Sequence, residues 1–482
     1  MVVNSFDFLL FFVVIFILYY FPLKEKIKAQ NILLLFASYF FYGCADIKML
    51  PILVIATLIF YYLGIAINKT TSENKSSVLT TAGVLIGVGT LLYFKYLNFF
   101  INSFADFFES FGLNVNLHTL NIIMPIGISF FTFRLISYVI EIHREKIEPT
   151  RNIISFGTYI AFFPCLLSGP IDRPNTFIPQ LEKKRSFNYD MAVDGMRQIL
   201  WGMFKKIVVA DNISAFTDSI WTDYSNLNGN TLFIGAILYT LQLYADFSGY
   251  SDMAIGVSKI LGFKVSLNFK YPFFTRNIAE FWRNWHMSLT SWLTDYIFMP
   301  LNLKFRDSGQ FGLILAILIN FFAIGMWHGA NYTFAVFGVY HGLLYIPLIL
   351  SGSFAKKSKI KLGKYGIPPY TDIIKMLGTF ILVTFGFIIF RSGSIEQTIN
   401  FITRIFMTSS LNFAFFYKTR EQSLAFIITL FSIFLLFYCE WFAFRKKDEF
   451  YKITNWRIYI FILIILLLGA FKNQLSYIYF NF

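Results

Sequence analysis

Long apolar runs separated by short polar segments dominate the hydrophobic pattern of this chain. Most runs are continuously apolar, and many approach or reach the roughly 17–25 residues that a helix needs to cross a hydrocarbon core. In lipid, helices and closed barrels alone satisfy all their backbone hydrogen bonds, so unbroken apolar runs predict helices rather than strands. The pattern predicts spans at about 6–22, 30–43, 51–67, 78–97, 122–142, 311–327, 331–351, 373–390, 423–444 and 457–475.

Three stretches in the middle of the chain depart from this simple pattern. Residues 152–171 are apolar but contain Pro164 and Pro170, which favours a re-entrant hairpin over a crossing. Residues 231–262 form an apolar run that the sequence DFSGYSD interrupts, and its length predicts a broken helix. Residues 277–301 are typical of an amphipathic interfacial helix. We therefore expect an all-α polytopic membrane protein of about 10–12 transmembrane helices with re-entrant and amphipathic helices.

The composition agrees with this class and excludes another. Of the 482 residues, 56% are hydrophobic and 14% are charged, with a net charge of +14. Basic residues cluster in short loops, which is typical of cytoplasmic loops and argues against nucleic-acid binding. These loops are 24–28, 143–151, 181–186, 355–364 and 445–452.

The charge pattern also predicts an orientation. The first apolar run meets a basic loop at 24–28, so the N-terminus is predicted to be periplasmic in a multi-pass protein of the inner (cytoplasmic) membrane. The opening stretch lacks a basic n-region and is interpreted as a retained span. No soluble domain is indicated. We expect one integral membrane domain over 1–482, made of N-terminal spans (1–120), a core (121–350) and C-terminal spans (351–482).

Ionisable residues inside a membrane domain are candidate functional residues by default. His328 lies in the sequence MWHGAN, where small residues allow close approach of another backbone or a substrate, and Asn331 could fix the imidazole ring. His286 and Arg283 share one face of the expected helix over 277–301, so we expect both to point into a polar funnel. His328 could equally be a buried structural residue bonded to a neighbouring carbonyl, and His286 could simply belong to an interfacial amphipathic helix with an aromatic belt.

Three further sets of polar residues have a structural or a functional interpretation. His341 is thirteen residues after His328 and is predicted to be structural or supporting. Cys165 could carry an acyl group, but no base is placed beside it, and the three cysteines show no metal-ligand spacing. The stretch 241–256 is either a polar hinge between helices or the lining of a polar substrate site. Its candidate residues are Gln242, Asp246, Ser248, Tyr250 and Ser251.

These residue types suit acyl transfer. A neutral imidazole can take the proton of a hydroxyl while that hydroxyl attacks an acyl thioester. Arg283, Asn331 or the indole N–H groups of Trp285 and Trp327 could stabilise the developing oxyanion. No metal or permanently bound cofactor is expected. A transporter without chemistry, or a scaffold for a periplasmic partner, would share the buried polar groups.

Several segments together resemble the membrane-bound O-acyltransferase superfamily, in the branch of polysaccharide O-acetylation proteins. They include MPIGISFFTFRLISYVIEIHR (124–144), FFPCLLSGPIDRP (162–174), GMFKKIVVADN (202–212), LYADFSGYSDMAIG (243–256), FWRNWHMSLTSWLTDYIFMPL (281–301), GMWHGANYTFAVFGVYHG (325–342), FRSGSIEQ (390–397) and the terminal IYFNF. The sequence departs from many relatives at Cys165 and Phe337, where they carry Gln and Trp.

The resemblance implies that His328 occupies the active-site position and that His286 is the second histidine of the same tunnel. It further implies a ring of helices around a central funnel, a cytoplasmic thioester donor (acetyl-CoA), a periplasmic acetyltransferase partner and an extracytoplasmic polysaccharide acceptor. The abundance of Phe, Ile, Lys and Asn suggests an AT-rich genome and favours peptidoglycan as acceptor. Alginate-like exopolysaccharide is the alternative, and D-alanyl transfer to teichoic acid is a weaker one.

Overall fold

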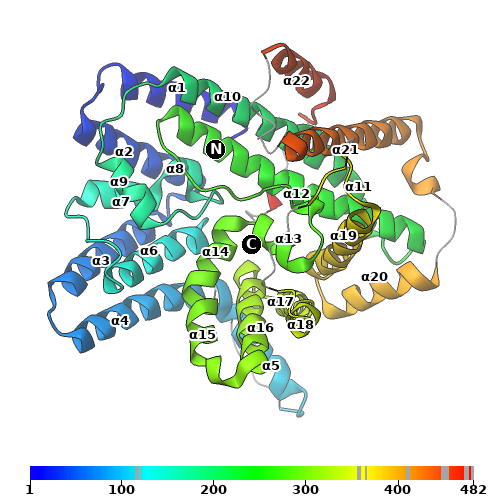
Figure 1. Ribbon diagram of the computed structural model, residues 1–482, viewed down its shortest axis with the longest axis horizontal. Coiled ribbons are helices and arrows are strands. Elements are labelled where there is room, and N and C mark those ends of the chain that lie inside the picture. The colour runs from blue at the N-terminus through cyan, green and yellow to red at the C-terminus, as the bar shows by residue number, and fades with distance from the viewer. Residues whose placement is uncertain are drawn as a thin grey trace. The chain divides into compact units, whose positions relative to one another are not determined.

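The computed structural model describes residues 1–113, 119–120, 122–354, 360–363, 366–408, 413–446, 455–471 and 477–478. Within these residues every regular element is a helix, which confirms the all-α class (Figure 1). Parts of the basic loops at 355–364 and 445–452, and most of the terminal IYFNF, lie outside the described residues.

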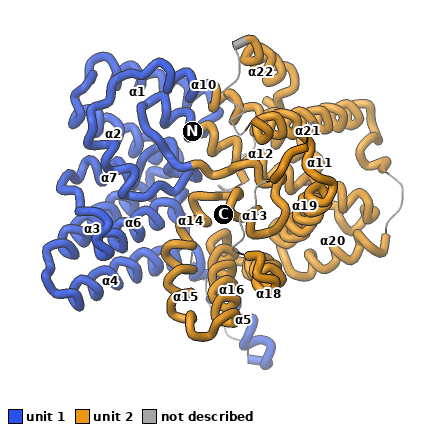
Figure 2. The backbone as a smooth tube through the Cα atoms, viewed as in Figure 1, with its two compact units in different colours: residues 1–196, 254–266 blue, residues 197–253, 267–482 orange. Residues whose placement is uncertain are grey.

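The chain divides into two compact units (Figure 2). Unit 1 comprises residues 1–196 and 254–266, and unit 2 comprises residues 197–253 and 267–482. Two helices, α10 (Tyr189–Met203) and α12 (Gly229–Ile260), contribute residues to both units. The predicted single domain over 1–482 stays a prediction.

Unit 1 contains the first nine α-helices, whose starts follow the capping signals of the sequence. Ser5 caps α1, Asn152 caps α7, and α3 has proline in its first turn, where the missing N–H costs nothing. The elements are α1 (Phe6–Tyr20), α2 (Ile27–Asp46), α3 (Leu50–Lys69), α4 (Glu73–Leu91), the π-helix η1 (Leu92–Tyr96), α5 (Leu97–Glu109), α6 (Ile128–His143), α7 (Ile153–Ala161), α8 (Phe163–Leu166) and α9 (Pro174–Leu181).

The predicted re-entrant segment 152–171 folds as two short helices that a buried arginine ties to α6. Helix α7 has nine residues and α8 has four, so neither is long enough to cross a bilayer. The Arg134 guanidinium donates hydrogen bonds of 3.1–3.2 Å to four carbonyl oxygens where these helices end. The acceptors are Tyr159, Ile160, Cys165 and Pro170. One cation thereby satisfies buried backbone groups that irregular structure would otherwise leave unbonded.

Unit 2 contains the remaining helices. They are η2 (Phe204–Ala210), α11 (Asp211–Thr222), η3 (Pro272–Phe274), α13 (Ile278–Asn284), α14 (Met287–Leu293), η4 (Thr294–Phe298), α15 (Met299–Lys304), η5 (Arg306–Ser308), α16 (Gly309–His328), α17 (Tyr332–Leu343), α18 (Ile346–Leu350), α19 (Tyr370–Arg391), α20 (Ile395–Met407), η6 (Ala414–Phe416), α21 (Arg420–Lys446) and α22 (Asn455–Leu468).

Six helical segments of the described chain are long and apolar enough to cross a membrane. They are Leu50–Lys69, Glu73–Glu109, Arg306–His328, Tyr332–Leu350, Tyr370–Arg391 and Arg420–Lys446. Helix α1 and residues Trp456–Leu468 of α22 are apolar but shorter. The polytopic membrane class is thus supported, with fewer qualifying spans than the predicted number. One reason is that α6, at 16 residues, is surrounded by protein and buries charged side chains such as Arg134 and Glu141.

The prediction of a broken helix over 231–262 was wrong. Helix α12 runs unbroken for 32 residues through its polar stretch. Its carboxylates are paired by lysines of η2: Lys206 Nζ lies 2.7 Å from Oδ1 of the buried Asp246, and Lys205 pairs with the half-buried Asp252. Because neighbouring side chains neutralise these charges, the α12 backbone does not need to open to water.

Candidate functional site

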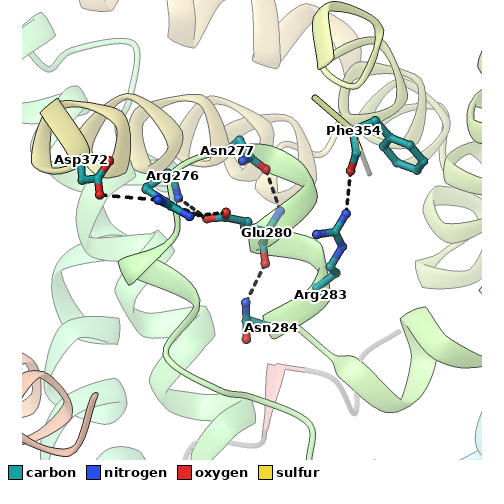
Figure 3. A network of polar contacts seen from close by, with 7 residues as sticks. All are labelled: Arg276, Asn277, Glu280, Arg283, Asn284, Phe354 and Asp372. Carbon is teal, nitrogen blue, oxygen red and sulfur yellow. Dashed lines mark hydrogen bonds and ion pairs between the residues drawn. The ribbon is translucent and has the colours of Figure 1, made fainter. Parts of the chain in front are cut away.

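Helix α13 is anchored by a polar network that begins at its first turn (Figure 3). Asn277 caps the helix by accepting the Glu280 N–H at 2.8 Å. The Glu280 carboxylate accepts the Arg276 guanidinium at 2.8 Å, and Arg276 also lies 3.5 Å from Asp372 of α19. At the other end, the Asn284 amide donates to the Glu280 carbonyl at 2.8 Å. Both ends of this seven-residue helix are therefore fixed before the chain reaches His286.

The chain breaks its helix at His286, contrary to the prediction of one amphipathic helix over 277–301. Trp285 is extended, and His286 has left-handed backbone angles, φ 44° and ψ 52°. The break places the two side chains differently from a continuous helix: His286 is buried, at 1% exposure, whereas Arg283 is exposed. The prediction that Arg283 and His286 share one helical face was wrong.

The structure brings His286 and His328 into one aromatic group. The ring of Trp327 is 5.6 Å from the His286 ring and 4.9 Å from the His328 ring, measured between centroids. We call His286, Trp327 and His328 the histidine cluster. On its far sides, Phe247 of α12 lies 4.6 Å from His286 and Phe390 of α19 lies 5.0 Å from His328. The two predicted catalytic histidines thus come together from separate segments of unit 2.

His328 owes its position to a tight turn between two closely packed helices. It is the last residue of α16, and α17 begins four residues later. At Gly325 a side-chain carbon would come within 2.1 Å of the Phe334 carbonyl, and at Gly338 within 2.3 Å of the Phe321 carbonyl. These glycines let the helix backbones approach closely, which holds His328 beside α17.

His341 makes the kind of contact expected of a supporting residue. Its Nδ1 accepts the Trp282 indole N–H at 3.3 Å, and the side chain is fully buried. Phe337 lies between the histidines, with ring centroids 4.6 Å from His341 and 6.0 Å from His328. Trp285 packs on Phe281, Phe387 and Phe269 at 5.1–5.3 Å and supports the same aromatic region.

An amphipathic cavity of about 380 Å³ adjoins this region within unit 2. Its polar wall includes Arg283, Thr290 and Asn320, and its apolar wall includes Ile324 and Tyr345. Met287, the residue after His286, also lines it, and Ile324 lies one turn before His328. The Arg283 guanidinium donates to the Phe354 carbonyl at 2.8 Å across the rim (Figure 3). This mixed lining suits a ligand that has both polar and apolar parts.

The five candidate polar residues of α12 have different interaction partners. Gln242 accepts the Thr217 hydroxyl at 2.7 Å. Asp246 pairs with Lys206 and accepts the Ile478 N–H at 2.8 Å. The remaining three are buried: Ser251 accepts the Asn268 amide at 3.0 Å, Tyr250 packs on Tyr477 at 4.9 Å, and Ser248 lies beside them on the helix. Sequence reasoning missed both Lys206 and Asn268.

Asn331 and Cys165 are two further residues that the sequence singled out. Asn331 caps α17 by accepting the Thr333 N–H at 3.0 Å and donates to the Gly393 carbonyl at 2.9 Å, so its amide is engaged away from the His328 ring. Cys165 is fully buried in unit 1. Among the described residues, no group of three or more histidine, cysteine or acidic side chains could hold a metal ion.

Comparison with known proteins identifies the family. Residues 34–384 match the model of MBOAT, the membrane-bound O-acyltransferase family. The chain belongs to the membrane-bound O-acyltransferase family. It is therefore a multi-pass membrane enzyme. Membership of an enzyme family favours acyl transfer over the transporter and scaffold alternatives, neither of which involves catalysis.

Individual relatives of this acyltransferase fall into three groups. It is 35% identical to the probable alginate O-acetylase AlgI of Pseudomonas aeruginosa over 402 residues, covering 82% of this chain and 73% of that protein. It is 30% identical to the peptidoglycan O-acetyltransferase of Helicobacter pylori over 399 residues, covering 76% and 72%. It is 30% identical to the teichoic acid D-alanyltransferase of Bacillus subtilis over 282 residues, covering 56% and 69%.

Burial governs the charge state of His286. His286 lies outside the six candidate spans, and burial lowers the pKa of its imidazole to about 3. The ring is therefore neutral throughout the physiological pH range. A neutral imidazole can accept or donate a hydrogen bond, but it does not supply a fixed positive charge to an oxyanion.

Proposed function

We propose that this acyltransferase moves an acetyl group from a cytoplasmic thioester donor, acetyl-CoA, toward an extracytoplasmic polysaccharide. We further propose His328 as the general base and His286 as the residue that orients the reacting groups. The observation that carries the proposal is the histidine cluster, in which one indole ring contacts both imidazoles. Membership of the acyltransferase family supports the reaction class.

The donor is proposed to enter through the amphipathic cavity. Arg283 at its rim would attract the phosphates of the donor, while the apolar wall at Ile324 and Tyr345 would accommodate the uncharged arm. The thioester would then reach the side of the cavity at Met287, next to His286 in sequence. This route assigns the cavity to binding and the histidine cluster to chemistry.

The proposed step is a general-base acyl transfer. The His328 imidazole accepts the proton of an acceptor hydroxyl as its oxygen attacks the thioester carbonyl carbon. The tetrahedral oxyanion collapses, the carbon–sulfur bond breaks, and the leaving thiolate takes the proton back from His328. The Trp327 indole N–H is the proposed hydrogen-bond donor to the oxyanion. The products are an O-acetyl ester and a free thiol.

Two acceptors deserve testing. The chain is 34–36% identical to probable alginate O-acetylases over about 400 residues. This similarity supports alginate or a similar exopolysaccharide as the acceptor. The residue composition and the 30% identity to a peptidoglycan O-acetyltransferase support peptidoglycan. Both acceptors are extracytoplasmic. We therefore also propose that the protein resides in the cytoplasmic membrane with its N-terminus outside, and that a periplasmic acetyltransferase completes delivery.

Ester analysis in cells tests this proposal. Acetate released by mild base is measured separately from purified peptidoglycan and from secreted polysaccharide, with and without the gene. We expect one polymer to lose its esters on deletion, and the wild-type gene but not His328→Ala to restore them. If both polymers keep their esters after deletion, the proposed function is wrong. If His328→Ala restores them, the assignment of the base is wrong.

A further inference from the structure

The backbone at His286 adopts a conformation that needs outside support. Among the described residues four non-glycine residues have positive φ: Glu25, Glu145, Tyr271 and His286. The first two are exposed and Tyr271 is half-buried, so His286 is the fully buried one. A side chain in the left-handed region crowds its own backbone, and such residues persist only where their surroundings hold them.

That support comes from a neighbouring non-helical segment, residues 268–270. The Met287 N–H donates to the Asn268 carbonyl at 2.8 Å, and the Lys270 N–H donates to the Asn284 carbonyl at 3.0 Å. These two bonds lie on either side of His286 in the chain. They hold the residues before and after the turn against the same short non-helical segment.

The Asn268 side chain makes two more hydrogen bonds, one as acceptor and one as donor. Its Oδ1 accepts the Ser288 hydroxyl at 2.6 Å, just after the turn, and its Nδ2 donates to the Ser251 hydroxyl of α12 at 3.0 Å. Asn268 is fully buried, and both serines are buried as well. Phe247, against which the His286 ring packs, lies one turn before Ser251 on α12. One amide thus links the histidine turn to the helix that contacts its ring.

We propose that Asn268 is a positioning residue that holds the His286 turn in its left-handed conformation and thereby sets the imidazole against Phe247 and Trp327. A carboxamide suits this role because it offers an acceptor and a donor at once, so it can bridge two hydroxyl groups in a buried site. The role in catalysis rests on the proposed function of the histidine cluster, whereas the effect on the position of His286 does not.

The test measures the position of His286 and the reaction separately. Purified full-length protein is treated with diethyl pyrocarbonate, and modification of each histidine is followed by peptide mass spectrometry, with half-buried His143 as internal reference. In Asn268→Ala we expect His286 to react at least about tenfold faster relative to His143, because loss of both side-chain bonds frees the turn. We also expect kcat for acetyl transfer to fall about 10- to 100-fold with little change in KM.

Ser288→Ala removes the 2.6 Å bond to the Asn268 side chain and keeps Asn268, so it serves if Asn268→Ala does not fold. Its expected effects are about threefold on His286 modification and less than tenfold on kcat. The matched control is Thr384→Ala, which removes the buried Thr240–Thr384 hydrogen bond of 3.2 Å elsewhere in unit 2. It should leave both measurements at wild-type values.

The outcomes separate the two ideas. If His286 stays protected in Asn268→Ala and Ser288→Ala, the positioning role is wrong, whatever happens to activity. If His286 becomes reactive and kcat is unchanged, Asn268 does hold the turn, but the proposed role of His286 in the reaction is wrong.

Discussion

Two buried clusters of unit 2 meet helix α12 and handle polarity in opposite ways: one includes Asp246 of this helix, and the other packs against its Phe247. In the first, which we call the charged cluster, Lys206 lies 2.7 Å from Asp246 and 2.8 Å from Asp211. In the second, the histidine cluster, aromatic rings surround two imidazoles. Full ions inside a protein must be paired, whereas a neutral imidazole can be buried among rings and still exchange a proton.

We expect the charged cluster to contribute to stability and the histidine cluster to contribute to catalysis. In the charged cluster the carboxylates of Asp211 and Asp246 share the Lys206 ammonium, which also lies 4.6 Å from the Tyr477 ring. Such a site holds segments together: it joins α12 to η2, α11 and, through the Ile478 N–H, the chain near its C-terminal end. Breaking the charged cluster should damage stability first. Breaking the histidine cluster should damage transfer first.

The largest effect on stability is expected for Lys206→Met, which keeps the length of the side chain and removes its charge. Asp211 and Asp246 would then face each other without a cation, at a cost of about 3–5 kcal/mol. Thermal unfolding in detergent should show a large fall in midpoint. Lys259→Met is the control: its ion pair with Asp194 is partly exposed and should cost less than about 1 kcal/mol. Equal midpoints for the two variants would contradict the structural role of the charged cluster.

The next effect tests the second histidine. His286→Asn keeps a residue that tolerates left-handed backbone angles and should lower acetyl transfer about 100-fold while leaving the unfolding midpoint near wild type. Since burial lowers the pKa of His286 to about 3, the imidazole does not titrate between pH 5 and 8. The pH profile of the variant should therefore have the wild-type shape at a lower rate. A limb that disappears from the profile in this pH range would show that His286 does titrate during turnover.

A smaller effect is expected at His341. His341→Leu leaves the Trp282 indole N–H without its acceptor, which should cost about 1–3 kcal/mol of stability. Acetyl transfer should fall less than tenfold, because a supporting residue acts only through packing. His143→Leu, which removes a half-buried ring bonded to Ser76 at 2.8 Å, is the control and should cost less than about 1 kcal/mol. A loss of transfer at His341 as deep as at His328 would place His341 in the chemistry.

The smallest effect belongs to the rim of the cavity. Arg283→Gln should raise KM for acetyl-CoA about three- to tenfold and leave kcat unchanged, because the exposed guanidinium contributes binding alone. Lys304→Gln, an exposed cation outside the cavity lining, should leave both constants unchanged. An unchanged KM in Arg283→Gln would remove the cavity from the donor route.

The sequence predicted the family and the helical class, because these depend on apolar runs and on ordered motifs. That both histidines serve one reaction stays a prediction, although both rings contact Trp327. The sequence did not predict the break at His286. The residues on both sides of the break keep a helical period, so one left-handed residue leaves no signal in the hydrophobic pattern.

The sequence also did not predict that α12 is continuous. Asp246 and Asp252 interrupt an apolar run, and the lysines that neutralise them lie about 40 residues earlier, on η2. Pairing over such a separation cannot be read from periodicity. Asn268 was missed for a similar reason: a lone amide in a non-helical segment resembles any other loop residue until Ser251 and Ser288 are seen to contact it.

The most direct test of the account compares acetyl transfer by purified wild-type protein and His328→Gln, with the unfolding midpoint measured on the same samples. Glutamine retains polarity and approximate size but cannot act as a base. We predict that the rate falls by about 10²–10⁴-fold while the midpoint stays at the wild-type value. A His328→Gln protein that folds normally and transfers acetyl groups at the wild-type rate would contradict the central claim.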